Sequence, residues 1–375
     1  YKYLKRDLIL VKEIYIIVRR VTMKLTFCLP EISQVPMGGY KIIFEYANRL
    51  TARGHEVSLV FLTHTVWNRI TKNKLIKSIV GQIKGRNRPS WFDLDPRIQK
   101  IMTPYLDGRD FPKADFVFAT AVSTAEIVKC LPAGCGKKCY FIQDFETFIA
   151  SEEKVVESYD YGFINFTVST WLNNLVKSYT HKDTICLPNP IDTEVFKVVT
   201  PIENRNPMTL GMLYHEGEHK GVSYALKAIE RVKEKYPEIT VNIFGVPERP
   251  RFLPDYFNYF QKVTQEELLQ LYNDTAIFVC ATIDEGFGLT GAESMACGCA
   301  LASTAYSGVF EYAVDGVNAL LSPVRDSSQL ANNIIKLIED NEHRQLLAKR
   351  ASDMLIERSW KATINKLEEE LSKRI

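Results

Sequence analysis

Two glutamates flank a glycine-rich stretch in the sequence DEGFGLTGAESMACG, at residues 284–298. Because the stretch follows a short apolar run and opens an alanine-rich one, we expect a turn between a buried strand and a helix. Glycines let a ligand approach the backbone closely, and free N–H groups at the start of a helix favour a phosphate. Glu285 precedes the turn and Glu293 follows it, and carboxylates accept hydrogen bonds from paired sugar hydroxyls. The pattern predicts a binding site for a diphosphate, with a carboxylate on each side.

Two alternatives for this stretch stay open. Residues 286–291 match G-x-G-x-x-G, with Glu311 about 20 residues further on, as in a dinucleotide-binding fold. That motif ordinarily occupies the first strand-to-helix turn of its domain, whereas this one comes late. An acid near the start of a helix is also favourable without any ligand, by a few tenths to ~1 kcal/mol, which applies more to Glu293 than to Glu285.

The composition of the chain is that of an ordinary globular protein. Of its 375 residues, 46% are hydrophobic and 25% charged, and the length favours two domains over one. The formal net charge of +2 gives no reason to expect a nucleic-acid partner.

The cysteines and the apolar runs indicate in which cellular compartment we expect the protein and whether it spans a membrane. None of the eight cysteines forms a C-x-x-C pair and several lie in apolar runs, which favours reduced thiols in a cytoplasmic protein. The group Cys130, Cys135 and Cys139 has the spacing of no standard zinc site, so we expect neither a metal nor a cofactor. The apolar stretch at residues 8–18 is interrupted by charges and is shorter than the ~20 residues of a membrane span.

From residue 24 the sequence alternates short apolar runs with helical periods, which predicts parallel β-sheets covered by helices on both faces. A proline-rich stretch interrupts the alternation, which then restarts. We therefore expect an N-terminal extension, a first Rossmann-like domain, a linker that lets the domains move, a second Rossmann-like domain and a charged C-terminal helix, at residues 1–22, 23–190, 191–207, 208–356 and 357–375. Two such doubly wound domains would face each other across a cleft that binds the ligand.

Four segments resemble one family. EGFGLTGAE, continued by SMACGCALAST, resembles the E-x7-E signature of retaining glycosyltransferases of family 4, which have the GT-B fold. Similar to other parts of that family are GGYKIIFEYANRLTARGHEV at 38–57, PNPIDTEVF at 188–196 and GVFEYAVDGVNALLSP at 308–323. The resemblance extends from residue 23 to about residue 370. It implies an α/β protein of two Rossmann-like domains facing a cleft, with a C-terminal helix that crosses back to the N-terminal domain.

The resemblance implies a role for each residue of the glycine turn. Glu285 would hold the hydroxyls of the donor sugar, and Glu293 would hold the ribose of a nucleotide sugar. The backbone of Phe287, Gly288 and Leu289 would lie against the sugar and the diphosphate. A nucleoside-diphosphate sugar is then the substrate, with no metal required.

The same resemblance places further donor-binding residues outside the turn. Lys220, in GMLYHEGEHKG, matches the lysine that binds the phosphates, and His215 stands where a second cation, usually arginine, is found. Val263 matches a position whose backbone meets the base. Gly38 and Gly39 would let the first loop fold over the diphosphate.

For the reaction, the resemblance implies retention of anomeric configuration, with Glu285 and Lys220 as the catalytic residues. We expect transfer on one face of the sugar, in which the leaving phosphate takes the acceptor's proton while the protein supplies positioning and positive charge. Two departures weaken the match. His215 stands in place of an arginine and is only partly charged near pH 7. Many members also carry a histidine near residues 119–121 that contacts the donor sugar, whereas this chain has none there.

A basic segment in the first domain bears on the acceptor. Between His64 and Trp91 there are seven basic residues and no acidic one, with apolar residues at helical spacing; the basic residues are Arg69, Lys72, Lys74, Lys77, Lys84, Arg86 and Arg88. Such a helix suits the headgroup region of an anionic membrane, here the inner face, although an ordinary packed helix with a solvated face gives the same pattern. We expect a glycan or lipid-linked glycan acceptor.

Three alternatives to a sugar transferase stay open at this point. A catalytically silent sugar-nucleotide-binding scaffold would explain the missing arginine and histidine. A GT-B-like phosphorylase or epimerase would share the cleft but needs phosphate-binding or acid–base residues that the sequence does not display.

Within the transferase hypothesis, YFIQDFE at 140–146 is similar to a segment of some rhamnosyltransferase-like members.

Overall fold

The computed structural model describes residues 22–66, 68 and 71–375, and it contains two parallel β-sheets. The first sheet has seven strands in the order β3-β2-β1-β4-β5-β6-β7, and the second has six in the order β10-β9-β8-β11-β12-β13. In both sheets the strand order reverses beside the first strand of the unit, the arrangement of a doubly wound fold whose ligands bind at the reversal. The predicted α/β class is confirmed.

Short apolar runs form the strands, most of which are buried along nearly their whole length. The first sheet consists of β1 (Lys24–Leu29), β2 (Glu56–Leu62), β3 (Gln99–Thr103), β4 (Phe116–Ala119), β5 (Lys137–Ile142), β6 (Ile164–Thr167) and β7 (Ile185–Cys186). The second consists of β8 (Thr209–Tyr214), β9 (Thr240–Gly245), β10 (Phe257–Gln261), β11 (Ile277–Cys280), β12 (Ala300–Thr304) and β13 (Ala319–Ser322).

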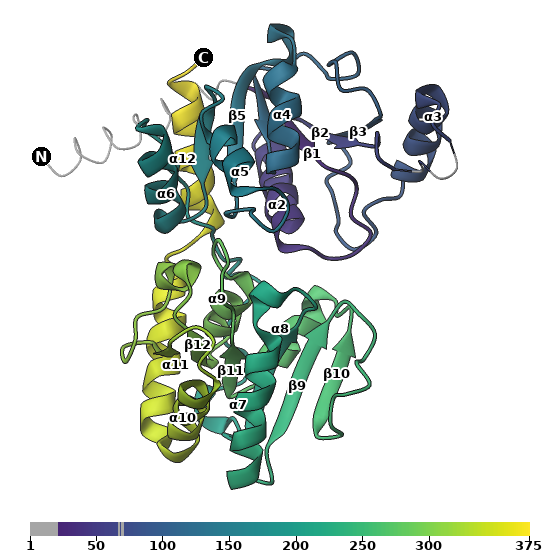
Figure 1. Cartoon of the computed structure of the whole chain (residues 1–375). Helices are drawn as coiled ribbons and strands as arrows, with labels where there is room; N and C mark the ends of the chain where they lie inside the picture. The colour runs from purple at the N-terminus through teal and green to yellow at the C-terminus, as the bar shows by residue number, and fades with distance from the viewer. Residues whose placement is uncertain (1–21, 67, 69–70) are drawn as a thin grey trace, which may run out of the picture.

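Helices connect the strands and cover both sheets (Figure 1). Those of the first unit are α2 (Gly38–Ala52), α3 (Lys74–Gly85), α4 (Val122–Cys130), α5 (Glu152–Tyr159) and α6 (Thr170–Thr180). Those that follow are α7 (Val222–Lys235), α8 (Gln265–Asn273), α9 (Leu289–Ala296), α10 (Ser327–Glu339), α11 (Asn341–Ile356) and α12 (Trp360–Ser372), with short 3-10 turns such as η3 (Glu218–Lys220) between.

The last helix returns to the first unit, as expected. In Figure 1, α12 lies in the upper, N-terminal half of the molecule, although the helices before it belong to the lower half. Trp360 packs edge-on against Tyr46 of α2, with ring centroids 5.1 Å apart, and Glu368 accepts a hydrogen bond from Arg53 at 2.7 Å and forms a contact of 3.0 Å with His55. The C-terminal helix therefore fastens the two halves together.

The proline-rich linker is anchored at several points. Asp192 forms an ion pair with Arg49 of α2 at 2.7 Å, and the backbone N–H of Ile191 donates to the carbonyl of Arg358 at 3.0 Å. Further along, the buried guanidinium of Arg205 donates to the carbonyls of Thr200, Tyr272, Thr275 and Cys297. These contacts fix the second half of the linker to the C-terminal domain, so any movement between the domains must occur nearer to its first half.

Two expectations concern segments that the structure covers only in part. The N-terminal extension, apart from residue 22, lies outside the described residues, as do Arg69 and positions 67 and 70 of the basic segment. Among the helices that are described, none combines the length and the apolar character needed to cross a bilayer.

Candidate active site between the two domains

A cavity of about 880 Å³ lies between the two domains. The N-terminal domain contributes the loop after β1, the start of α2, the inner side of α3 and the loop after β5. The C-terminal domain contributes the η3 loop and the glycine turn before α9. The cavity therefore lies at the carboxyl ends of the strands of both sheets, where the sequence predicts the cleft.

Lys220 and Glu285 form the charged centre of the C-terminal wall. The ammonium of Lys220 lies 2.6 Å from a carboxylate oxygen of Glu285, and both side chains are largely buried. The pairing is imposed by the backbone, because the carbonyl of His219 accepts hydrogen bonds from the N–H groups of Ile283 and Asp284. Two residues that the sequence places 65 positions apart thus meet at one point of the cavity.

Gly221 explains why the η3 loop approaches so closely. It has φ +61°, and a Cβ there would lie 1.9 Å from the carbonyl oxygen of Ala281. Only glycine fits a positive φ at such a short distance from backbone. The K-G pair thus brings Lys220 onto the end of β11.

The glycine turn is packed more tightly by protein than the sequence indicates. A Cβ on Gly286 would lie 2.0 Å from the carbonyl oxygen of Gln143, in the other domain, and one on Gly288 would lie 1.9 Å from the hydroxyl of Tyr306. Gly291 lies close to the hydroxyl of Tyr312. We predicted glycine here for close approach of a ligand, but these three glycines are already required for packing.

Two helices begin at the cavity from opposite domains. Gly38 and Gly39 open α2, and Leu289 opens α9 after Gly288, which has φ +92°. A Cβ on Gly38 would lie 3.4 Å from the side chain of Leu289, so the two helix starts are neighbours. Both helix N-termini present unpaired N–H groups and a partial positive charge, which together favour an anionic group between them.

Glu293 lies deeper than its predicted role requires. One of its carboxylate oxygens is 2.7 Å from the ammonium of Lys41 on α2, and the other accepts a hydrogen bond of 3.4 Å from the hydroxyl of Tyr272. The side chain is 6% exposed and does not line the cavity. Sequence reasoning missed Lys41, which lies 252 residues away and also contacts the ring of Phe196 at 4.8 Å.

Val263 also lies outside the cavity lining. It follows β10, is partly buried against the main apolar core and precedes Thr264, whose side chain caps α8. The structure therefore brings most of the predicted residues to one cavity and leaves Glu293 and Val263 behind its wall. The residues on the cavity are Gly38, Gly39, His215, Lys220, Glu285, Phe287, Gly288 and Leu289.

The two histidines beside Lys220 are poor cations in this geometry. Burial lowers the pKa of both His215 and His219 below the usual 6.5, and the ammonium of Lys220 lowers each of them further. Both imidazoles are therefore largely neutral at pH 7. Positive charge on this wall of the cavity comes from Lys220 and the helix N-termini until an anion binds and stabilises imidazolium.

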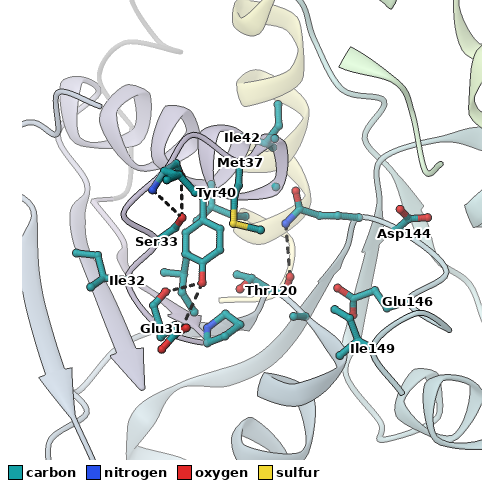
Figure 2. A pocket seen from close by; sticks show the side chains of 18 of the residues that line it. Glu31, Ile32, Ser33, Met37, Tyr40, Ile42, Thr120, Asp144, Glu146 and Ile149 are labelled. Atoms are coloured by element: carbon teal, nitrogen blue, oxygen red, sulfur yellow. Dashed lines mark hydrogen bonds between the residues drawn. The ribbon is translucent and has the colours of Figure 1, made fainter. Parts of the chain in front are cut away.

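The loop after β5 supplies acidic residues that sequence reasoning did not assign. Asp144 and Glu146 line the cavity on the wall that faces Tyr40 and Met37, as Figure 2 shows. Burial raises the pKa of both carboxyl groups to about 7. Their position directly after a buried strand is the same signal that identified Glu285, and it could have indicated this loop as well.

Comparison with known proteins agrees with this geometry. Residues 203–354, most of the C-terminal domain, match the family described as Glycosyl transferases group 1. Over 167 residues the chain is 30% identical to an uncharacterized glycosyltransferase of Methanocaldococcus jannaschii, which amounts to 41% of this chain and 42% of that protein. Over 246 residues it is 23% identical to D-inositol 3-phosphate glycosyltransferase of Corynebacterium urealyticum, 58% of each. The chain thus spans about half the length of the curated relatives it matches.

Solved structures extend the likeness to nearly the whole chain. Anabaena HepE in complex with UDP-glucose has a TM-score of 0.70 at 16% identity and covers 94% of this chain and 100% of its own. Sucrose-phosphate synthase from Thermosynechococcus elongatus has a TM-score of 0.73 at 13% identity, with 93% and 98% covered. At these identities the likeness establishes the architecture. The chain therefore has the GT-B fold, and its residues 203–354 match the Glycosyl transferases group 1 family.

Proposed function

We propose that this protein is a retaining, metal-independent glycosyltransferase of family 4, which moves a sugar from a nucleoside diphosphate to a glycan or lipid-linked glycan. The observation that carries the proposal is the pairing of Lys220 with Glu285, at 2.6 Å, on a cavity where helices α2 and α9 both begin. A nucleotide sugar has the matching chemistry, because its diphosphate is anionic and its sugar hydroxyls are hydrogen-bond donors.

Each residue of the cavity then has a part in the transfer. The diphosphate lies between the helix starts at Gly39 and Leu289, with Lys220 beside it, and Glu285 holds the sugar hydroxyls. The bond from the anomeric carbon to the phosphate oxygen breaks, and the bond to the acceptor oxygen forms on the same face. The acceptor's proton passes to the leaving phosphate. Lys220 and the helix N-termini stabilise the charge that develops there.

In this proposal, Glu293 and Val263 bind the nucleoside part of the donor. In this proposal the ribose hydroxyls reach the carboxylate of Glu293, which must share or exchange its contact with Lys41. The base lies beside the backbone at Val263. Neither residue lines the cavity, so the proposal requires that Glu293 rearrange its contacts with Lys41 and Tyr272 to admit the nucleoside.

The acceptor side of the cavity adjoins a basic and apolar helix. The outer face of α3 exposes Leu75, Ile76, Ile79 and Ile83, while its inner face contributes Gly81, Lys84 and Gly85 to the cavity lining. We extend the proposal to a peripheral contact of α3 with the inner, anionic face of a membrane, from which a lipid-linked acceptor would enter. Lys77 takes no part in this surface, because it is buried and donates to the carbonyl of His64 at 2.8 Å.

Thermal-shift measurements with UDP, GDP, dTDP and ADP, each with and without EDTA, test the donor site. At a free concentration of 100 times Kd, the bound nucleotide adds ~2.7 kcal/mol of stability. We expect one nucleotide to raise the midpoint equally in EDTA, and Lys220→Ala to abolish the shift. The corresponding nucleotide sugars follow, including a dTDP-deoxyhexose because of the rhamnosyl-type resemblance at residues 140–146. A product whose anomeric configuration is inverted in NMR spectra would contradict retention.

One observation favours a silent sugar-nucleotide-binding scaffold instead. Both glutamates of the signature already have lysine partners, Glu285 with Lys220 and Glu293 with Lys41. Glu285→Ala separates the two functions. An enzyme loses turnover, by ~100-fold or more if the contact forms with the transition state, whereas a scaffold keeps its partners and has no turnover to lose.

A further inference from the structure

The loop after β5 crosses the cavity and contacts the donor-binding wall at two points. The carbonyl of Gln143 lies against Gly286, where a Cβ would come within 2.0 Å of its oxygen. Further along, the ring of Phe148 stacks on His219, with centroids 5.3 Å apart and planes inclined by 11°. Asp144 lies between these two contacts in the sequence, so its backbone is held against the glycine turn that carries Glu285.

Asp144 has few interactions of its own in this position. One carboxylate oxygen accepts a hydrogen bond of 2.8 Å from the N–H of the next residue, Phe145. Over residues 22–66, 68 and 71–375, no lysine, arginine or histidine comes within ion-pair distance of Asp144. Its neighbour Glu285, by contrast, is paired with Lys220. Asp144 therefore has a second carboxylate beside it on the cavity, that of Glu285, and the ammonium of Lys220 is paired with Glu285.

Packing gives a reason for the other acid of this loop but not for Asp144. Glu146 accepts a hydrogen bond of 2.5 Å from the N–H of Val122 and so caps the start of α4. Asp144 caps no helix and bonds to no other side chain in the region that the structure describes. Asp144 is half-buried, and placing a carboxyl group there with one local hydrogen bond costs stability, which is typical of a group kept for a ligand.

We propose that Asp144 is a ligand of the transferred sugar, accepting a hydrogen bond from a hydroxyl on the side that faces the N-terminal domain, opposite Glu285. This inference rests on the proposed function, since it needs a nucleotide sugar in the cavity. The donor sugar is then held by one carboxylate from each domain, and Asp144 contributes only while the loop after β5 remains against Gly286.

The charge on Asp144 gives this contact a dependence on pH. Burial, followed by the nearby carboxylate of Glu285, raises its pKa to about 7, while the N–H of Phe145 and the ammonium of Lys220 oppose the shift. The groups that face it are Glu285, Asp284 and Lys220 from the C-terminal domain, and Glu146 and Tyr159 from its own. Because the ionised form is the better acceptor, the sugar contact strengthens as pH rises through 7.

Calorimetric binding of the free nucleoside diphosphate and of the nucleotide sugar, on wild type, Asp144→Asn and Asp144→Ala, tests the inference. The nucleotide screen described above supplies the probes. We expect both variants to bind the nucleoside diphosphate within ~3-fold of wild type and the nucleotide sugar ~10- to 100-fold more weakly, the range for a hydrogen bond to a charged group. The preference of wild type for the sugar-bearing ligand should increase from pH 6 to pH 8, and that of Asp144→Asn should not.

Glu153→Gln is the matched control, because Glu153 is an exposed acid on α5 of the same domain. If the Asp144 variants bind the nucleotide sugar as wild type does, the inference is wrong. The inference is also wrong if the Asp144 variants bind the nucleotide sugar normally and lose only affinity for the acceptor, since Asp144 then contacts the acceptor. If wild type binds no nucleotide at all, the proposed function itself fails, and that outcome is distinct from the other two.

Discussion

Gly288 shows how narrowly single residues are constrained at this site. It starts α9 with φ +92°, and a Cβ would lie 1.9 Å from the hydroxyl of Tyr306. That hydroxyl is itself fixed, because it is 2.5 Å from the hydroxyl of Tyr312 and both rings are fully buried. Neither the turn nor its neighbour can therefore move aside for a methyl group.

We predict that Gly288→Ala lowers the free energy of unfolding by about 1–3 kcal/mol, through backbone strain at positive φ and the clash with Tyr306. Gly134→Ala is the control, because Gly134 has nothing within 4 Å of its added Cβ and lacks a positive φ. That control should stay within ~0.5 kcal/mol of wild type. Urea unfolding of both variants without ligand is the measurement, and equal midpoints for the two would contradict the prediction.

Residue types and spacing pointed to Glu285 and the glycine turn, and the family resemblance added Lys220. Glu285, Lys220 and the glycine turn lie on one cavity because each follows a strand of the same parallel sheet, a position that the sequence pattern indicates. Lys41 could not be found in this way, since its contact at the site depends on how two domains pack, whereas Asp144 follows a strand and was not assigned. No local pattern reports a contact between residues 252 positions apart.

At the level of elements, α3 is apolar on its outer face. Its buried residues are Lys77, Gly81 and Gly85, of which the two glycines lie against Met102 of β3, whereas four large apolar side chains are exposed. Figure 1 shows it at the margin of the N-terminal domain, beside β3. Lys72, Lys74 and Arg86 are exposed on the same segment. The combination fits an anionic, apolar surface.

We predict that the protein sediments with vesicles containing phosphatidylglycerol and not with neutral phosphatidylcholine vesicles, and that added salt weakens the binding. Replacing Ile79 and Ile83 together by serine should reduce binding ~10-fold, because both side chains leave water on insertion. Leu346→Ser, at a similarly exposed leucine of α11, is the control. Equal losses in the two variants would show that α3 has no special role.

Periodicity predicts α3 as a helix, but it cannot show which side faces the protein. The sequence has basic residues and isoleucines on one helix, and we expected Lys77 to belong to its basic face. In the structure Lys77 is buried, since it bonds to the carbonyl of His64 and to the side chain of Asn68. Two glycines one turn apart on the inner face allow the helix to approach β3, and this favours burial of the side opposite the isoleucines.

Across the whole molecule, one of the tight contacts between the domains is made at a glycine, Gly286. Gly286 has the carbonyl oxygen of Gln143 2.0 Å from the position of its missing Cβ, and its own carbonyl accepts a hydrogen bond of 2.9 Å from the indole of Trp171. Thr170, next to that tryptophan, donates its backbone N–H to Glu311 of the C-terminal domain at 2.5 Å. The start of α6 and the loop after β5 thus form the N-terminal side of the interface.

We predict that Gly286→Ala separates the domains without unfolding them. A methyl group cannot fit against the Gln143 carbonyl, so the radius of gyration measured by small-angle X-ray scattering should rise. Under the proposed function, in which Lys220, Val263 and Glu293 of the C-terminal domain bind the nucleoside diphosphate, its affinity should change by less than ~3-fold. Turnover should fall at least ~10-fold because the reacting groups lose their alignment. Gly134→Ala serves again as the control, and an unchanged radius with normal turnover would contradict the prediction.

The two doubly wound parallel sheets and the return of the last helix were predicted from the alternating pattern and the family resemblance. How closely the domains approach did not, because that distance is set by individual contacts such as those of Gly286 and Trp171. The proline-rich stretch was predicted as a linker that permits movement. In the structure Arg205 anchors its second half, a role that a lone arginine in a polar segment does not reveal.

The ion pair between Lys41 and Glu293 has a consequence for how the protein receives its substrate. With a cation at 2.7 Å and a tyrosine hydroxyl on its second oxygen, the carboxylate is already oriented before any nucleoside arrives. A ribose that takes the place of Lys41 therefore meets a side chain whose rotational freedom has already been lost, so binding forfeits less entropy. Under the proposed function, a contact that keeps the cleft in shape would thus become a contact that recognises the substrate.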